Sequence, residues 1–178
     1  KGGKFCINGV TGPDEYKTVV NNNAYTNVMA RENLRYAAET VASLRTHTPD
    51  VYTALVRKTG LEPSEVEAWQ RAAESMYVPY DEQRGIVPQD DSFLDREPWD
   101  FQHTPPDSYP LLLFYHPLDI YRKQVIKQAD VVLAMFLLGA VFSPEAKQRN
   151  FAFYDPLTTG DSSLSSCIEA IIAAQIGD

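Results

Sequence analysis

The feature that most constrains this chain is an uninterrupted apolar run in its C-terminal half. Every residue from 131 to 142 is apolar. A helix without a polar face is buried inside a domain, so we predict one helix from Leu118 or Arg122 to Phe142 whose apolar part lies inside a helical assembly. The run has only about twelve residues, which is too short to cross a membrane.

Helix start and stop residues divide the rest of the chain into further helices. Polar caps and Pro at the first helical position begin helices, and Gly ends them. The expected helices are Ala24–Arg45 after the polar cluster Asn21–Asn23, a short one across Val51–Lys58 that Gly60 ends, one from the capping box Ser64–Glu67 to about Met76, Pro144 to about Phe151, and a last one through Leu164–Ile172. We therefore predict an all-α fold of five or six helices, as half of an α/α toroid would have, with a short extended hairpin between residues 77 and 93.

A long loop from Leu94 to Pro117 is rich in proline and aromatic residues. Loops of this length in compact domains are functional or disordered, and the many aromatic residues argue against disorder. These side chains either pack over the ends of the helices or stack against a sugar, and both alternatives stay open. We assign neither His103 nor His116 to catalysis.

A turn near the N-terminus carries the candidate catalytic group. Gly9, Gly12 and Pro13 exclude a regular helix or a central strand, so Asp14 and Glu15 project from irregular backbone. A carboxylate on a rigid turn suits acid–base chemistry. The alternative is that these carboxylates only offset the dipole of the next helix.

Two polar residues, Lys127 and Gln128, stand just before the apolar run. Buried Lys and Gln side chains need partners. They either bond neighbouring loops or line a polar cavity, and we regard them as candidate substrate-binding residues.

Short polar residues also mark the start of the last helix. Gly160 is followed there by Asp161, Ser162 and Ser163. The free N–H groups and hydroxyls of a helix N-terminus bind phosphate well, and Gly160 would let an anion approach the backbone. Plain N-capping by Asp161 or Ser162 explains the same residues without a ligand.

Composition excludes several classes of function. The formal net charge of −8 without a basic cluster argues against a nucleic-acid surface. Cys6 and Cys167 are too few for a disulfide framework or a zinc site, so we expect free thiols, a reducing compartment and a cytoplasmic location. The sequence contains no nucleotide-binding or metal-binding motif, and we expect no cofactor, no metal and no membrane partner.

Three blocks in order resemble glycoside hydrolase family 65. They are Gly9–Tyr16 with the following Asn22–Ala30, then Gln124–Val132, and finally Asp161–Ser165. That family holds inverting maltose, trehalose and kojibiose phosphorylases and a few hydrolases. The resemblance implies that residues 1–178 are a fragment of the catalytic (α/α) barrel domain, with a β-sandwich domain and the first half of the barrel upstream.

The resemblance also implies roles for the candidate residues. Glu15 would be the general acid, and Lys127 and Gln128 would hold the glucosyl unit. Ser162 and Ser163, with Gly160, would bind inorganic phosphate, the co-substrate of the disaccharide. We further expect that apolar surface left open on a fragment can be covered by a second copy, as in a homodimer.

Two departures from the family's pattern bear on the activity. Many members have a phosphate-binding His where this chain has Gly160, which raises an inverting α-glucoside hydrolase as the alternative. The family also commonly has His in place of Lys17, and trehalose, maltose and kojibiose all stay open as substrates. A second alternative, weaker because three family-like blocks converge, is a non-catalytic helical interaction module. It gains support for the fragment alone, because an isolated half-barrel would lack the upstream sugar contacts.

Overall fold

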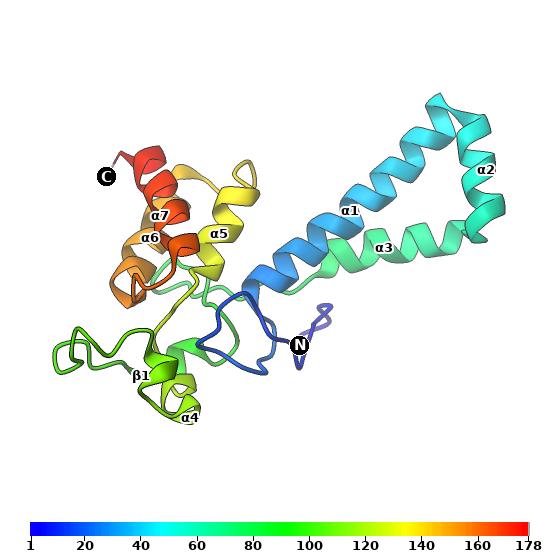
Figure 1. Cartoon of the computed structure of the whole chain (residues 1–178). Coiled ribbons are helices and arrows are strands. Elements are labelled where there is room, and N and C mark those ends of the chain that lie inside the picture. Colours follow the sequence, from blue (N-terminus) through cyan, green and yellow to red (C-terminus); the bar gives the residue numbers. More distant parts are fainter. Residues whose placement is uncertain (178) are drawn as a thin grey trace. The chain divides into compact units, whose positions relative to one another are not determined.

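The computed structural model describes residues 1–177 and consists mainly of helices joined by long loops (Figure 1). The chain forms two compact units. The first contains residues 1–6 and 27–77, and the second contains residues 7–26 together with the chain from residue 78 onward.

The first unit is a helical hairpin. The helices α1 (Ala24–His47) and α3 (Pro63–Ser75) run side by side, and α2 (Pro49–Thr59) joins them at the tip (Figure 1). Ahead of α1, Asn23 Oδ1 accepts a hydrogen bond from the N–H of Thr26 at 2.9 Å, so the predicted asparagine cap is confirmed.

The ends of α2 and α3 follow local sequence, with one correction. Pro49 begins α2 behind Thr48, and Gly60 ends it with φ of 70°. The predicted capping box over Ser64–Glu67 is wrong by two residues, because Pro63 occupies the first helical position and Glu62 is the N-cap. Glu65 Oε2 accepts the N–H of Glu62 at 2.9 Å, which is the backward half of a capping box.

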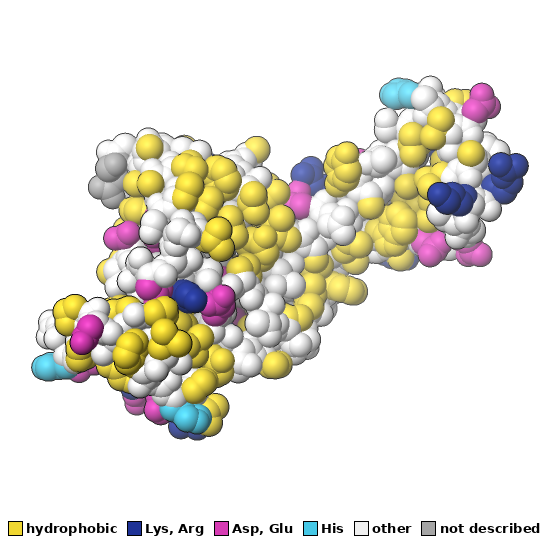
Figure 2. Space-filling model, in the orientation of Figure 1, with side chains coloured by type: hydrophobic (Ala, Val, Ile, Leu, Met, Phe, Trp, Pro, Cys, Tyr) yellow, Lys and Arg dark blue, Asp and Glu magenta, His cyan; other side chains and the backbone are white. Residues whose placement is uncertain are grey.

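The second unit is built on three helices that pack against one another, α5 (Asp130–Leu137), α6 (Pro144–Tyr154) and α7 (Ser163–Ile176). Hydrophobic side chains gather over α5 and α7 on the face shown in Figure 2. The buried core between these helices includes Val132, Met135, Phe151, Tyr154 and Ile172. As predicted, α6 begins at a Ser143-Pro144 cap, where Ser143 Oγ accepts the N–H of Ala146.

The predicted long helix from Leu118 or Arg122 to Phe142 is wrong. Its place is taken by a short helix α4 (Pro117–Tyr121), a two-residue strand β2 (Lys123–Gln124), a loop and the eight-residue α5. The loop is irregular because its N–H groups are bonded elsewhere. Ile126 N donates to Leu157 O at 2.9 Å, and Lys127 N donates to the carboxylate of Asp14 at 2.9 Å.

Burial along the apolar run is uneven. Val132 and Met135 are buried, as expected of an inner helix, whereas Leu137 and Val141 are 47% and 43% exposed. The prediction of a buried apolar helix is therefore confirmed for most of α5. It is wrong for Leu137, at the end of α5, and for Val141 beyond it.

The long aromatic loop packs around Tyr16, Ile120 and Val125 in a second, smaller core. It contains the 3₁₀ turns η1 (Phe93–Asp95) and η2 (Leu111–Leu113), and β1 (Glu97–Pro98) pairs in parallel with β2. The rings of Trp99 and Tyr115 meet edge to face at 5.1 Å. The structure shows packing for these two rings, and stacking of the loop's aromatic residues against a sugar stays a prediction.

The remaining elements are short. The predicted extended hairpin is reduced to one antiparallel bridge between Asp81 and Ile86. A third 3₁₀ turn, η3 (Asp155–Leu157), follows α6. Residues 1–177 contain seven α-helices in place of the five or six expected, since α4 was not foreseen as a separate helix. Within the same residues, no helix combines the length and apolarity needed to cross a membrane.

Candidate active site

The N-terminal turn is held in place at both ends. Val10 and Val20 pair through two backbone hydrogen bonds of 2.9 and 2.8 Å, which closes the loop that contains Glu15. At Gly12 a Cβ atom would lie 2.5 Å from Asn23 Nδ2 and 2.7 Å from Asp130 Oδ2. Only glycine allows the turn to approach these two side chains so closely.

Asp14 anchors the turn from within. Its side chain is buried, and Oδ1 accepts the N–H groups of Tyr16 at 3.1 Å, Lys127 at 2.9 Å and Gln128 at 3.3 Å. Oδ2 accepts from Gln89 Nε2 at 2.9 Å. One carboxylate thereby fixes the backbone on both sides of Glu15 and the loop ahead of α5. Asp14 is structural here, and Glu15 is the accessible carboxylate of the pair.

Glu15, Lys127 and Gln128 come together, as the sequence predicted. The Glu15 side chain is 53% exposed, and Lys127 Nζ donates a hydrogen bond to its Oε2. The N–H of Glu15 donates to Gln128 Oε1 at 3.0 Å. The hydrogen bond from Lys127 lowers the pKa of Glu15, so the carboxylate is charged in this arrangement.

A second carboxyl group lies beneath the turn. Asp130 begins α5, is buried, and accepts a hydrogen bond from Asn23 Nδ2 at 2.9 Å. Burial, reinforced by the nearby charge of Asp14, raises the pKa of Asp130 to about 8. Burial also raises the pKa of Asp14, although the charge of Lys17 and the hydrogen bonds that Asp14 accepts oppose that change. The proton of this pair therefore belongs on Asp130.

Lys17, which replaces the family's common His, is buried and bonded to backbone. Its Nζ donates to the carbonyl oxygens of Lys123 at 2.7 Å and Val125 at 3.0 Å. Burial lowers the pKa of Lys17 to about 8, against the opposing charge of Asp14. Lys17 thus holds the segment that leads to Lys127.

The Gly160–Ser163 segment leaves the start of α7 without a side-chain cap. Gly160 has φ of 70°, and Ser162 is the N-cap residue, but its side chain makes no capping hydrogen bond. Asp161 is engaged elsewhere, accepting from Thr159 Oγ1 at 2.5 Å and from Tyr16 OH at 2.7 Å. The N-capping alternative proposed for Asp161 or Ser162 is therefore wrong for their side chains.

Ser165 joins the start of α7 to the loop of Lys127. Its Oγ donates to Lys127 O at 2.6 Å and accepts the N–H of Ala129 at 3.4 Å. The two candidate binding segments are thus in direct contact.

A cavity of about 380 Å³ brings the candidate acid and the start of α7 together. It is lined by residues from the turn, from α5 with the loop before it, and from α7: Pro13, Glu15, Gln128, Ala129, Leu133, Ser163, Leu164, Ser165, Cys167 and Ile168. Among these lining residues, Glu15 carries the only carboxylate. Lys127, Gly160 and Ser162 adjoin the cavity along the chain but do not belong to its lining.

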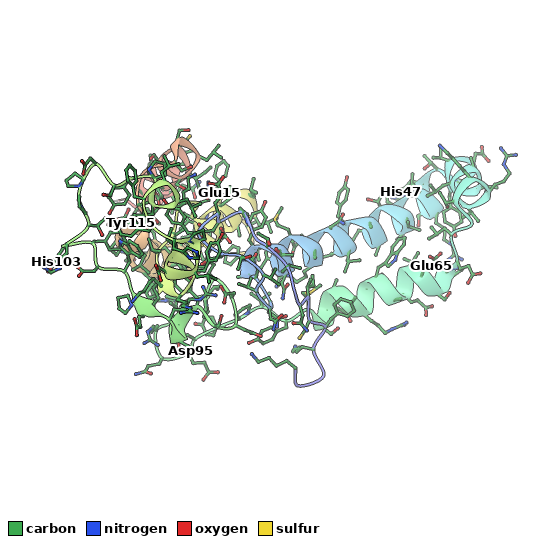
Figure 3. The ribbon with its side chains drawn as sticks, turned by 60° about the horizontal axis from the view of Figure 1, so that its bottom comes forward. Glu15, His47, Glu65, Asp95, His103 and Tyr115 are labelled. Carbon is green, nitrogen blue, oxygen red and sulfur yellow. The ribbon has the colours of Figure 1, made fainter. Side chains whose placement is uncertain are left out.

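The two histidines of the aromatic loop lie outside this cavity. His103 sits at the tip of the loop, apart from Glu15 (Figure 3), and its Nδ1 is 2.8 Å from Asp100 Oδ2. His116 caps α4 by accepting the N–H of Leu118 at 3.2 Å. Among residues 1–177, no group of three His, Cys, Asp or Glu side chains is placed to hold a metal ion.

Several residues that build the site were not identified from the sequence. Tyr16 and Asp161 are 145 positions apart, and neither was assigned a role at the other's site. Gln89, a buried partner of Asp14, was not noted at all. The only available signal was that Tyr16 and Asp161 each stand beside a candidate residue.

Known proteins are similar in sequence to this chain over nearly its whole length. A model of the glycosyl hydrolase family 65 central catalytic domain matches residues 1–178. An alpha,alpha-trehalose phosphorylase of Geobacillus stearothermophilus is 53% identical over 99% of this chain and 23% of its own length. A kojibiose phosphorylase of Halothermothrix orenii is 38% identical over 98% of this chain and 22% of its own.

A solved structure agrees with these relatives. It is a protein from the human microbiome, assigned as a kojibiose phosphorylase, with a TM-score of 0.86 and 33% identity over 98% of this chain and 24% of that chain. The chain thus spans about a quarter of the length of the proteins it matches. The likeness confirms the predicted all-α class and is consistent with part of an α/α toroid.

Proposed function

The chain belongs to glycosyl hydrolase family 65, and we propose that it forms part of the catalytic (α/α)6 barrel of an inverting disaccharide phosphorylase. The enzyme would cleave an α-glucoside of the trehalose, maltose or kojibiose type with inorganic phosphate and release glucose 1-phosphate. Because the chain spans about a quarter of its relatives, the experiments below use the full-length polypeptide that contains it.

Inverting cleavage needs two groups on opposite faces of the sugar. A protonated carboxyl gives its proton to the leaving oxygen, while a nucleophile attacks from the other face. In a hydrolase the nucleophile is water activated by a second carboxylate about 6.5–9.5 Å from the first, whereas in a phosphorylase it is phosphate itself. A phosphorylase therefore needs an anion site in place of a base.

The observation that carries the proposal is the lining of the cavity. Glu15 and the start of α7, at Ser163, line the same space. We assign Glu15 as the general acid and the segment from Gly160 through Ser162 to Ser163 as the anion site. The uncapped start of α7 supports that assignment, because its N–H groups favour negative charge.

Lys127 and Gln128 would hold the glucosyl unit beside Glu15. Gln128 lines the cavity, and Lys127 contacts the acid directly. A general acid must carry a proton, so a bound sugar that engages the ammonium of Lys127 would also weaken the bond that keeps Glu15 ionised.

Phosphorolysis is preferred over hydrolysis because the uncapped start of α7, a candidate anion site, shares the cavity with Glu15. Within the part of the chain that the structure describes, Glu15 is the only carboxylate in the cavity lining, since Asp14 and Asp130 are buried beneath the turn. Gly160, in place of the family's phosphate-binding His, is the observation that keeps an inverting hydrolase as the second candidate. Two relatives at 53% and 48% identity are named alpha,alpha-trehalose phosphorylases, which makes trehalose the first substrate to test.

One assay distinguishes the two candidates. The full-length protein is incubated with trehalose, maltose or kojibiose, with and without inorganic phosphate, and glucose 1-phosphate and free glucose are quantified. We expect glucose 1-phosphate to form only with phosphate, and fastest from one disaccharide. Equal release of free glucose without phosphate would establish the hydrolase, and no cleavage of any of the three would contradict both.

A further inference from the structure

Tyr16 joins the acid turn to the start of α7. Its side chain is fully buried, and its hydroxyl donates to Asp161 Oδ2 at 2.7 Å while accepting the N–H of Leu111 at 2.7 Å. The other oxygen of Asp161 accepts from Thr159 Oγ1 at 2.5 Å. Tyr16 directly follows Glu15, and Asp161 directly precedes Ser162. One hydrogen bond therefore links the acid turn directly to the segment before α7, beside the indirect link that runs through Lys127 and Ser165.

Several features stabilise the hydrogen bond from Tyr16 to Asp161. Burial, together with the hydrogen bond to Asp161, raises the pKa of Tyr16, so the phenol stays protonated and remains a donor. A hydrogen bond to a charged acceptor is shorter and stronger than one between neutral groups. The tyrosine side chain has only two rotatable bonds, and here it is packed in the small core with Leu111, Ile120 and Val125. The turn cannot move relative to Asp161 without breaking this contact.

The hydrogen bond from Tyr16 also keeps the carboxylate of Asp161 away from the N–H groups at the start of α7. Asp161 directly precedes the N-cap residue Ser162, so its carboxylate could otherwise turn toward the first N–H groups of α7. The bonds from Tyr16 and Thr159 orient its two oxygens instead. Released from Tyr16, the carboxylate would be free to cap α7 and to repel an anion at that point.

We propose that Tyr16 is a positioning residue, whose hydrogen bond to Asp161 fixes Glu15 relative to the start of α7 and keeps that start open for phosphate. The inference rests on the proposed phosphorylase function. It extends that function because Tyr16, a residue outside the cavity lining, would set the distance between the proton donor and the nucleophile.

The test is Tyr16→Phe in the full-length enzyme, with the KM for phosphate and the KM for the disaccharide measured separately. The variant loses the hydroxyl and keeps the ring. We expect the KM for phosphate to rise about tenfold, the scale of a buried hydrogen bond to a charged group, and the KM for the disaccharide to change less than about twofold. A merely structural loss would affect both constants together.

Tyr154→Phe is the matched control. Tyr154 is also a fully buried tyrosine, and its hydroxyl donates to Val87 O at 2.6 Å in the larger core, away from Asp161. It should leave the ratio of the two KM values unchanged. The double variant Tyr16→Phe/Asp161→Asn should show a smaller rise in the KM for phosphate than Tyr16→Phe alone, because it removes the released charge.

The outcomes separate the inference from the function on which it rests. A wild-type enzyme that cleaves without phosphate would overturn both. A phosphate-dependent wild type in which Tyr16→Phe leaves the KM for phosphate unchanged, or raises both KM values equally, would overturn the inference alone. If Tyr16→Phe does not fold by circular dichroism, Asp161→Ala takes its place. It removes the acceptor of the Tyr16 hydroxyl, and an unchanged KM for phosphate in this variant would also contradict the inference.

Discussion

The ammonium group of Lys127 donates a hydrogen bond to the carboxylate of Glu15, while the side chain of Gln128, the next residue, accepts the N–H of Glu15 at 3.0 Å. Both interactions come from a loop whose backbone is tied to Asp14, the residue before Glu15. The protonation of the proposed acid therefore depends on where the Lys127 ammonium lies. That dependence can be measured.

Replacing Lys127 by Met should move the pH profile of the enzyme. The hydrogen bond from Lys127 lowers the pKa of Glu15, so its removal raises that pKa. Because the acid must be protonated, the limb of the kcat/KM profile that falls with rising pH should shift to higher pH. The overall rate should drop as well, since Lys127 is also proposed to bind the sugar. Lys123→Met is the control, since Lys123 pairs with Glu97 and does not touch Glu15. An unshifted limb would show that Lys127 does not control the acid.

Glu15→Gln tests the acid itself. Glutamine keeps the size and hydrogen bonding of the side chain but has no proton to transfer, so kcat should fall by about 10²–10⁴-fold while the KM for the disaccharide changes little. Glu97→Gln, which alters an exposed carboxylate outside the cavity, should retain wild-type activity. Near-normal turnover in the Glu15 variant would rule out its role.

Asp130→Asn should change how stability depends on pH. The pKa of Asp130 is raised to about 8 from a usual value of 3.8, so the folded state binds more protons than the unfolded state between those values. This contribution to the free energy of unfolding is complete below about pH 4 and is lost as pH rises to about 8. The asparagine side chain cannot ionise. The variant should therefore gain about 3 kcal/mol on wild type between pH 5 and pH 8, since each pH unit in this range contributes about 1.4 kcal/mol at most.

Urea unfolding of both proteins at the two pH values measures this difference. Groups that do not interact with Asp130 cancel in the comparison, whereas Asp14 and Lys17 interact with its charge and add to the measured difference. Parallel stability curves for the wild type and the variant would mean that Asp130 is already ionised in the folded protein.

Much of the fold was predictable because its determinants are local. The start of α6 depends on Ser143 and Pro144, and the end of α2 depends on Gly60, all of which act within one helical turn. The long helix was mispredicted for the opposite reason. The N–H groups of Lys127 and Gln128 bond to Asp14, which is 113 and 114 positions away and which no periodicity in the run could reveal.

The candidate site likewise has contacts that could be predicted from the sequence and contacts that could not. The resemblance to the family implied one site for Glu15, Lys127 and Gln128, and the structure brings the three together. The bond from Tyr16 to Asp161 was not predictable, because a buried phenol needs some acceptor and the sequence does not say which. Sequence motifs identified the candidate groups, whereas tertiary contacts decide how those groups are spaced.

Ser163→Ala tests whether the start of α7 binds the nucleophile. If the anion site is correct, the N–H groups there and the hydroxyls of Ser162 and Ser163 should converge on one phosphate, on the face of the sugar opposite Glu15. Removal of the Ser163 hydroxyl should then raise the KM for phosphate by about 5–10-fold and leave the KM for the disaccharide within about twofold, the scale of one hydrogen bond.

Ser166→Ala is the matched control for this last variant. Ser166 is an exposed serine in the next turn of α7, its hydroxyl donates to Ser162 O, and it lies outside the cavity lining. It should leave both KM values at the wild-type level. If Ser163→Ala raises the KM for the disaccharide instead, Ser163 contacts the sugar and the phosphate must bind elsewhere. If neither constant changes, the start of α7 is not the anion site, and the case for hydrolysis, with a second carboxylate outside this chain, becomes the stronger one.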